Sequence, residues 1–271
     1  MKNNIDYSVI ISTCDAFSDL WDAYFDFFKK NWADCPAKVY LVTDKETSRR
    51  FDGIEIIAAG AGAEITERLA KALEKIDTEY ILFTLEDYFL IQKIENAKLD
   101  NALQFMNEEN VDYIRLYGAS RYYLRKEGAR ESVSYPGFYF RDISEGNYKV
   151  SLYAGLWRTD FMRKTLGKKQ NAWQYEVSLT QMARDLDACC VISNNREFPI
   201  LDVIRKGKLL HRAKKYLKEN GCSLPSREVI GYRAEFSIWF RTKLRHIFPQ
   251  KSFSKIKRVM VRRGHRFYSK D

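Results

Sequence analysis

Short apolar runs that end in polar residues alternate with amphipathic stretches along the first half of the chain. Residues 7–13, 38–44 and 80–90 have the length and the β-branched and aromatic content of buried strands. Residues 65–76 carry apolar side chains every three or four positions, which predicts an amphipathic helix. Strands that alternate with helices predict an α/β protein with a mixed, mainly parallel, Rossmann-like sheet flanked by helices.

The rest of the chain continues the alternation less regularly. Thr159 is expected to cap a short helix that stops at Gly167, and Asn171 to cap the next helix. Residues 120–149 lack a clear period and predict a long loop or a small hairpin. Further strands are predicted at 112–118 and 150–157, and further helices at 18–32, 100–109 and 209–220.

Two adjacent carboxylates, Glu86 and Asp87, interrupt the apolar strand at 80–90. Carboxylates at the tip of a buried strand are costly without a cation, a hydrogen-bond donor or an open cleft beside them. Their position therefore indicates a ligand site. The alternative is an acidic strand end that merely faces solvent.

Two neighbouring strands also end in polar residues. The first is followed by Ser12, Thr13, Cys14 and Asp15, and residues 38–44 end in Thr43 and Asp44. Because parallel strands present their carboxyl ends at one edge of a sheet, we expect these residues near Glu86 and Asp87. The chain has no glycine fingerprint after the first strand, no Walker lysine and no Gly-x-Ser-x-Gly, which disfavours dinucleotide, P-loop and hydrolase sites.

Basic residues near this edge are candidate phosphate ligands. Arg68 and Lys71 share one face of the helix at 65–76 and could meet a diphosphate, or could simply pair with glutamates on the helix surface. Arg205 and Lys208 belong to a second basic cluster, for which a surface turn is the equally simple interpretation.

Trp173 and Glu176 lie three residues apart at the start of the helix capped by Asn171. An aromatic ring beside a carboxylate is suited to hold a sugar hydroxyl and accept its proton. An acidic residue in a first helical turn is equally well explained by the helix dipole.

Composition describes a folded protein with an unusual C-terminus. With 271 residues and 45% hydrophobic content the chain can form one large or two small domains. No apolar run is long enough for a membrane helix and the start is polar, so we expect a cytoplasmic protein. The odd number of cysteines, five, without Cys-x-x-Cys pairs disfavours a disulfide framework or structural zinc.

The formal charge of +10 resides entirely in residues 233–271, which hold twelve Lys and Arg against two acids. Apolar residues interleave with the basic ones, as in a helix that lies on an anionic membrane. We therefore predict a basic amphipathic helical tail, possible contact with the inner face of the cell membrane, and no nucleic acid partner. The alternative is a solvated helix whose aromatic residues pack on the protein body.

Taken in order, five segments resemble bacterial GT-A-type glycosyltransferases, specifically the glycosyltransferase-2-like proteins of surface polysaccharide assembly. The resemblance spans roughly residues 6 to 220, and the order and spacing of the segments carry it, because no single motif is diagnostic. The segments are VIISTCDAFSDLW, ERLAKALEKIDTEYILFTLEDYFL, SLYAGLWRTDFM, NAWQYE and DVIRKGKLL.

The resemblance implies a nucleotide-sugar-binding catalytic domain at 1–220, with 221–271 as a basic extension. Its donor would be a nucleoside-diphosphate sugar and its acceptor a glycan or a lipid-linked glycan. Glu176 would be the base of an inverting transfer, and Asp87 would be catalytic through a Mn or Mg ion that it holds with Glu86. Donor binding would involve Ser12, Thr13, Cys14, Asp15, Arg68, Lys71, Glu86, Asp87, Arg205 and Lys208, and acceptor binding Tyr153, Trp157 and Trp173.

The metal motif departs from the family pattern. The usual motif is Asp-x-Asp, whereas Glu86 and Asp87 are adjacent and Phe89 follows them. One carboxylate and substrate phosphates suffice for Mg or Mn; otherwise basic residues must neutralise the diphosphate. Two other functions remain open: a nucleotidyltransferase acting on a sugar phosphate, and a non-catalytic module that binds anionic polymers.

Overall fold

The computed structural model of the chain describes residues 5–116, 123–124, 127–222, 226–237 and 240. It divides into two compact units, residues 1–202 and 203–271. This division lies before the predicted boundary at residue 220. None of the helices among the described residues is both long and apolar enough to cross a membrane.

A nine-stranded mixed sheet forms the centre of the first unit, with the strand order β3-β2-β1-β4-β9-β6-β10-β8-β7. Four neighbouring strands, β3, β2, β1 and β4, are parallel, and β9 runs against β4 and β6. This confirms the mixed, mainly parallel sheet. The strands are β1 (Tyr7–Ser12), β2 (Lys38–Thr43), β3 (Ile54–Ala58), β4 (Tyr80–Leu85), β6 (Tyr113–Arg115), β7 (Arg130–Glu131), β8 (Phe138–Phe140), β9 (Gly155–Arg158) and β10 (Cys190–Ser193).

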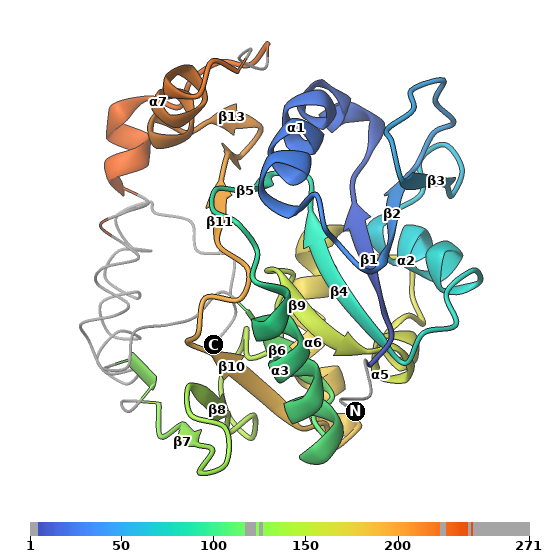
Figure 1. The fold of residues 1–271 in the computed structure, drawn as a ribbon, viewed down its shortest axis with the longest axis vertical. Helices are drawn as coiled ribbons and strands as arrows, with labels where there is room; N and C mark the ends of the chain where they lie inside the picture. The colour runs from blue at the N-terminus through green and yellow to red at the C-terminus, as the bar shows by residue number, and fades with distance from the viewer. Residues whose placement is uncertain (1–4, 117–122, 125–126, 223–225, 238–239, 241–271) are drawn as a thin grey trace, which may run out of the picture. The chain divides into compact units, whose positions relative to one another are not determined.

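Helices cover both faces of this sheet (Figure 1). Three helices, α2 (Ile65–Leu73), α5 (Thr159–Thr165) and α6 (Ala172–Asp185), share one hydrophobic core with side chains of the central strands. Ile10 of β1 belongs to this core and is fully buried. Further helices are α1 (Trp21–Trp32), which follows a 3-10 helix at Asp15–Leu20, and α3 (Asn96–Glu108).

The predicted strand at 80–90 is interrupted at its two carboxylates. Glu86 and Asp87 form a turn after β4, and β5 (Tyr88–Leu90) leaves the large sheet to pair antiparallel with β11 (Ile200–Asp202). The turn exists because two charged groups cannot continue a strand whose neighbours are buried on both faces.

The predicted strand at 150–157 begins only at Gly155. The backbone N–H groups of Lys149 and Leu152 instead donate to the α6 side chains Thr180 and Glu176, at 2.9 Å and 3.2 Å. Those donors are therefore unavailable to a neighbouring strand. The cap at Asn171 is confirmed: its side chain accepts from the N–H of Gln174, which completes a capping box.

The second unit holds a small hairpin and a helix. Strands β12 (Ile204–Arg205) and β13 (Lys208–Leu209) pair through a turn in which Lys206 and Gly207 both have positive φ, at 54° and 74°. This is the geometry of the tight turns that suit the twist of a hairpin. Helix α7 (His211–Glu219) follows, and residues 232–237 form a further helical stretch. Most of the predicted basic tail, residues 241–271, lies outside the described residues.

Candidate functional site

The polar ends of β1, β2 and β4 lie at one edge of the sheet, as the sequence predicts, because the three strands are adjacent and parallel. The backbone N–H of Thr13 donates to the carbonyl of Val42 at 2.9 Å. The N–H of Asp15 donates to the Asp44 carboxylate at 2.7 Å. These bonds fix the loop after β1 against the end of β2.

Each predicted member of this loop has a different environment. Ser12 is buried at the end of β1. Thr13 is also buried, and its hydroxyl oxygen accepts a hydrogen bond from the indole N–H of Trp21 at 2.8 Å, which gives it a structural task. Cys14 is half-buried, whereas Asp15 is exposed and forms an ion pair with Lys45 at 2.8 Å. The backbone and Cys14 are thus the parts of the loop best placed to meet a ligand.

Electrostatic interactions connect this loop with Glu86 and Arg68. Burial raises the pKa of the Cys14 thiol, and Glu86 adds to the rise, while the Arg68 guanidinium opposes it. Burial also opposes ionisation of Asp44, yet hydrogen bonds and Arg68 keep the pKa of that carboxyl below its ordinary value. The structure therefore gathers two acids, a cation and a thiol at the ends of three strands.

Glu86 is buried, with 7% of its surface exposed, and Asp87 is half-buried. Both raise the pKa of the Tyr24 hydroxyl, for which burial is the main cause. Two carboxylates in so dry a position are energetically costly unless cations or donors approach them. Glu86 is therefore buried at the end of β4, whereas Asp87 is only partly so, and the assignment of the two acids to a ligand site stays a prediction.

An aromatic column stands beside Asp87. The rings of Tyr88 and Tyr153 stack with centroids 5.4 Å apart and planes 7° apart, and the Arg115 guanidinium lies over Tyr153 at 4.4 Å. Burial raises the pKa of Tyr88 well above its ordinary value, and Asp87 is the largest electrostatic contributor. Asp202 and Glu176 also raise the pKa of the Tyr88 hydroxyl.

The predicted acceptor-binding residues lie in different environments. Tyr153 stands in the aromatic column, Trp173 is 49% exposed in the first turn of α6, and Glu176 is half-buried on the same helix. Trp157 is different: it is fully buried among Phe83, Tyr113 and Phe161. A sealed indole offers no face to a sugar, so Trp157 is a core residue, which corrects the prediction.

The predicted basic ligands separate into three situations. Arg68 reaches the carbonyl of Ala63 at 2.7 Å and acts electrostatically on Cys14. Lys71 is exposed and pairs with Glu74 on the helix surface, which is the simpler of its two interpretations. Arg205 and Lys208 belong to the β12–β13 hairpin of the second unit, where Lys208 pairs with Glu228 at 2.6 Å.

Within the described part of the chain, no group of three or more His, Cys, Asp or Glu residues has the arrangement of a metal site. The donor chemistry at the end of β4 nevertheless fits a hard cation. Mg and Mn take oxygen ligands, need only one or two carboxylates, and complete their shell with water and phosphate oxygens. Glu86 and Asp87 would be the residues to hold such an ion.

Three residues of this region were not among the predicted site residues: Arg115, Tyr88 and Asp202. Arg115 had a detectable signal, because a charged side chain in the short apolar strand after Asp112 requires a special environment. Tyr88 and Asp202 had none, since their proximity depends on the pairing of β5 with β11.

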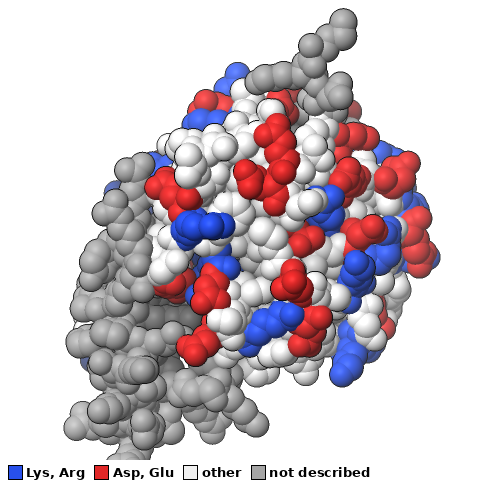
Figure 2. Space-filling view, turned by 90° about the horizontal axis from the view of Figure 1, so that it is seen from below, with Lys and Arg blue, Asp and Glu red and all other residues white. Residues whose placement is uncertain are grey.

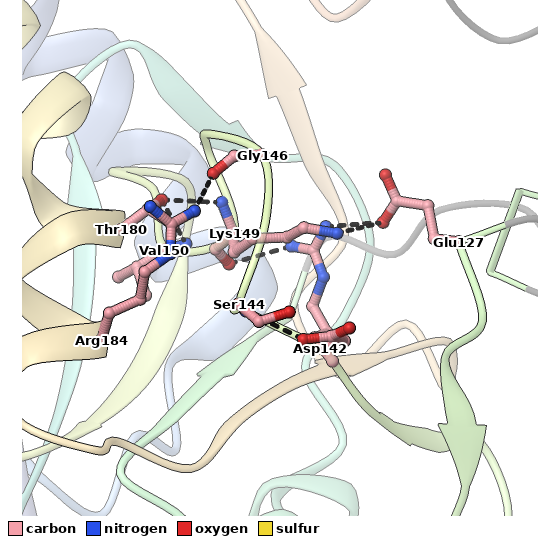
Figure 3. Close-up of polar contacts among 9 residues, drawn as sticks. Glu127, Asp142, Ser144, Gly146, Lys149, Val150, Thr180 and Arg184 are labelled. Carbon is pink, nitrogen blue, oxygen red and sulfur yellow. Dashed lines mark hydrogen bonds and ion pairs between the residues drawn. The ribbon is translucent and has the colours of Figure 1, made fainter. Parts of the chain in front are cut away.

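A second charged cluster lies in the segment between β6 and β9. The Glu127 carboxylate pairs with Arg141 at 2.9 Å and with Lys149 at 3.4 Å, and Figure 3 shows the Lys149 ammonium directed at it. Burial opposes ionisation, but hydrogen bonds and the two cations lower the pKa of Glu127. Burial lowers the pKa of Lys149. On the face of the molecule drawn in Figure 2, by contrast, acidic and basic side chains are interspersed.

No family model matches the chain, and no curated protein is similar to it in sequence. Solved structures are similar in fold. Staphylococcus aureus TarS, residues 1–349, in complex with UDP-GlcNAc has a TM-score of 0.50 at 16% identity, over 75% of this chain and 60% of that one. The mannosyltransferase PcManGT from Pyrobaculum calidifontis, in complex with GDP-Man and Mn2+, has a TM-score of 0.49 at 13% identity, over 74% and 58%.

CMP:2-keto-3-deoxy-manno-octonic acid synthetase complexed with CTP has a TM-score of 0.44 at 14% identity, over 69% of this chain and 88% of that one. The chain spans between about a third and three fifths of the TarS chains that it matches. Together with the sheet and its helices, the likeness to TarS shows that the first unit has the fold of GT-A-type glycosyltransferases.

Proposed function

We propose that the protein is a glycosyltransferase that moves a sugar from a nucleoside-diphosphate sugar to a glycan or lipid-linked acceptor. The observation that carries this proposal is that the β1 loop, the buried Glu86 and the half-buried Asp87 share one edge of a GT-A-type sheet, with Glu176 within electrostatic reach of the neighbouring Tyr88. The resemblance of the sequence favours a role in capsule, lipopolysaccharide or related polysaccharide assembly.

The donor nucleotide would occupy the loop after β1, between Cys14 and Asp44. Its diphosphate would lie toward Glu86 and Asp87, and Arg68, which acts electrostatically on Cys14 and Asp44, would be its basic ligand on α2. TarS has been solved with UDP-GlcNAc and PcManGT with GDP-Man and Mn2+. A divalent cation held by Asp87 and Glu86 would neutralise the diphosphate in this chain.

The transfer chemistry follows from charge. As the bond between the anomeric carbon and the phosphate lengthens, positive charge grows on the sugar and negative charge on the leaving diphosphate. Cationic groups near the diphosphate therefore stabilise the transition state more than the ground state. Glu176, whose carboxylate is oriented by the N–H of Leu152 at 3.2 Å, would take the proton of the attacking acceptor hydroxyl, which gives inversion.

A thermal-shift and calorimetric screen of nucleoside diphosphates, with and without Mn2+, tests the donor proposal. A ligand that binds only the folded state raises the melting temperature, and we expect one nucleotide to do so more strongly with the ion. Asp52→Asn, at an exposed position in the turn before β3, is the control for Asp87→Asn. If no nucleotide binds the wild-type protein, the proposed function is wrong.

The C-terminal segment would hold the enzyme at an anionic membrane surface. Tyr232, Phe236 and Phe240 are 78%, 62% and 45% exposed and are spaced at intervals of four residues, so they share one helical face. Exposed aromatics next to a strongly basic segment are typical of interfacial helices. Flotation on vesicles with and without acidic lipid, using the full chain and a Phe236→Ser/Phe240→Ser variant, tests this. Equal flotation of both proteins would exclude these aromatic residues from docking.

A further inference from the structure

Arg115 is a half-buried cation held by an aromatic face. It ends β6, and its guanidinium lies 4.4 Å from the ring centroid of Tyr153. Tyr113, two residues earlier on the same face of the strand, belongs to the core shared with α6, so Arg115 also stands on the α6 side of the sheet. This is the side that carries Glu176.

The anionic partner expected for such an arginine is not in the described part of the chain. Arg115 forms no ion pair with any described carboxylate, and its Nε is buried without a hydrogen-bond partner there. By contrast, Arg158, at the end of the neighbouring strand β9, pairs with Glu79 and Asp112. A guanidinium has five donors in a planar fork that matches carboxylate and phosphate oxygens, so an arginine without an ion pair among the described residues is suited to bind an anionic ligand.

The position of Arg115 assigns it to one half of the site. Strand β6 is two places from β4 in the sheet, on the side away from β1 and β2, whose loops would hold the nucleotide. Between Arg115 and Asp87 stands the stacked pair of Tyr153 and Tyr88. The column therefore leads from the predicted diphosphate site into the acceptor half.

The two ends of the column differ in charge. Tyr88 has three carboxylates within electrostatic reach, those of Asp87, Asp202 and Glu176. An anionic group of the acceptor is disfavoured at the Tyr88 end, which these carboxylates share with the proposed donor diphosphate, and is attracted at the Arg115 end. An acceptor with one negative group would thus be oriented, with its neutral hydroxyl toward Glu176 and its anion toward Arg115.

We propose that Arg115, with Tyr153 beneath it, is an acceptor-specificity residue that binds a phosphate or carboxylate group of the acceptor. This inference rests on the proposed function and specifies its acceptor class: a glycan or lipid-linked glycan that carries an anion close to the attacking hydroxyl. Tyr153 fixes the plane of the guanidinium, which leaves its outer N–H groups for a bidentate contact.

The inference is tested by comparing the affinities of small probes for the full-length protein. The protein is first saturated with the nucleoside diphosphate that the screen identifies. The probes are glycerol 3-phosphate against glycerol, and glucuronic acid against glucose. We expect wild-type protein to bind at least one anionic probe about tenfold more tightly than its neutral counterpart, as one charge-assisted bidentate contact provides. The pair that shows the preference distinguishes phosphate from carboxylate.

Arg115→Gln is expected to abolish this preference, and Arg115→Lys to keep part of it. Arg130→Gln is the matched control, because Arg130 lies over Phe140 at 5.3 Å in the same kind of contact but is exposed. The melting temperature identifies folded variants. Equal binding of charged and neutral probes by the wild type, or a preference that survives in Arg115→Gln, would overturn the inference while leaving the proposed function intact. Loss of nucleotide affinity in Arg115→Gln would also overturn it, by moving Arg115 to the donor half.

Discussion

Two arginines in the first unit, Arg141 and Arg115, are withdrawn from water in different ways. The Arg141 side chain is 4% exposed, pairs with Glu127 at 2.9 Å and donates to the carbonyl of Lys149 at 2.9 Å. Arg115 rests on Tyr153 and has no carboxylate partner among the described residues. Both positions are costly for a cation, but only Arg141 has its counter-charge within the described structure.

This difference distinguishes a structural ion cluster from a candidate ligand-binding site. Around Glu127, ion pairs and hydrogen bonds hold the segment before β9 in place. The backbone N–H groups of Lys149 and Val150 donate to Thr180, and Arg184 donates to carbonyls of the same segment (Figure 3). At the end of β4, by contrast, Glu86 and Asp87 are adjacent carboxylates, and Arg68 acts electrostatically on Cys14 and Asp44 in the neighbouring loops. Mutations in the first region should therefore affect stability, and mutations in the second should affect binding and turnover.

The largest effect is expected for Glu176→Gln, which removes the proposed base while keeping an oxygen that accepts from the N–H of Leu152. Turnover of the donor should fall about 100- to 10,000-fold, with the melting temperature and nucleotide affinity unchanged. Single-turnover kinetics measure the loss. The control is Asp185→Asn, an exposed acid in the last turn of α6. Unchanged turnover in Glu176→Gln would remove Glu176 from this role.

Glu127→Gln should have the opposite profile. It leaves Arg141 and Lys149 buried without their counter-charge, and removing one partner of a buried pair costs about 3 kcal/mol. Urea unfolding should show this loss, while nucleotide affinity persists in the fraction that is folded. Glu108→Gln, at an exposed acid at the end of α3, is the control. If Glu127→Gln were as stable as wild type, the cluster would not be a structural support.

Three of the four parallel strands, β1, β2 and β4, were predicted from the sequence because each is an apolar run bordered by polar residues. The prediction failed at residues 150–154, where side chains of α6 take the backbone donors. That outcome depends on which helix packs nearby, and no local pattern contains it. The strands β3 and β10 were missed altogether.

The candidate site was predictable only in part, for a related reason. Glu86 and Asp87 are conspicuous because charge in an apolar run is locally improbable. The acceptor side depends on long-range contacts, such as Tyr153 on Tyr88 and β5 on β11. An isolated aromatic residue has the same appearance in a core as in a binding site, which is why Trp157 was misassigned.

Asp87→Asn is expected to weaken donor binding by about tenfold and to abolish any gain from Mn2+. An amide oxygen still accepts hydrogen bonds, but it carries no charge for a divalent ion. Calorimetry with and without the ion measures both effects, with Asp52→Asn as control. The melting temperature of the variant, measured alongside, separates a loss of donor binding from a loss of stability. Identical donor affinity would contradict the proposed donor site.

Glu197 sharpens the contrast with Glu127, because it is a buried carboxyl that forms no ion pair with any described cation. Burial raises its pKa, although the Ser193 hydroxyl donates to it at 2.5 Å. The stability it contributes is therefore present below the ordinary pKa and lost as pH rises through the raised one. Glu197→Gln should stabilise the protein at pH 7 by an amount on the order of 1 kcal/mol and lose this advantage near pH 4. Melting temperatures across that range measure the effect, and a pH-independent difference would contradict it.

Lys71 and Arg68 provide the smallest expected effect and the finest test of the comparison. The two residues lie on one helix and were predicted together as diphosphate ligands. Lys71 is exposed and paired with Glu74, whereas Arg68 acts to lower the pKa of Cys14 and of Asp44. Exposed pairs of this spacing are worth only about 0.3 kcal/mol. Lys71→Ala should therefore leave donor affinity and stability almost unchanged.

Arg68→Gln should lower donor affinity, most clearly in the absence of Mn2+, when no other cation compensates the diphosphate. Calorimetric titration of both variants under the same conditions decides between them. A loss in Lys71→Ala as large as that in Arg68→Gln would mean that the diphosphate extends along the exposed face of α2. The donor site would then include α2 as well as the strand ends. The distinction between paired surface charges and ligand-binding charges would not hold for Lys71.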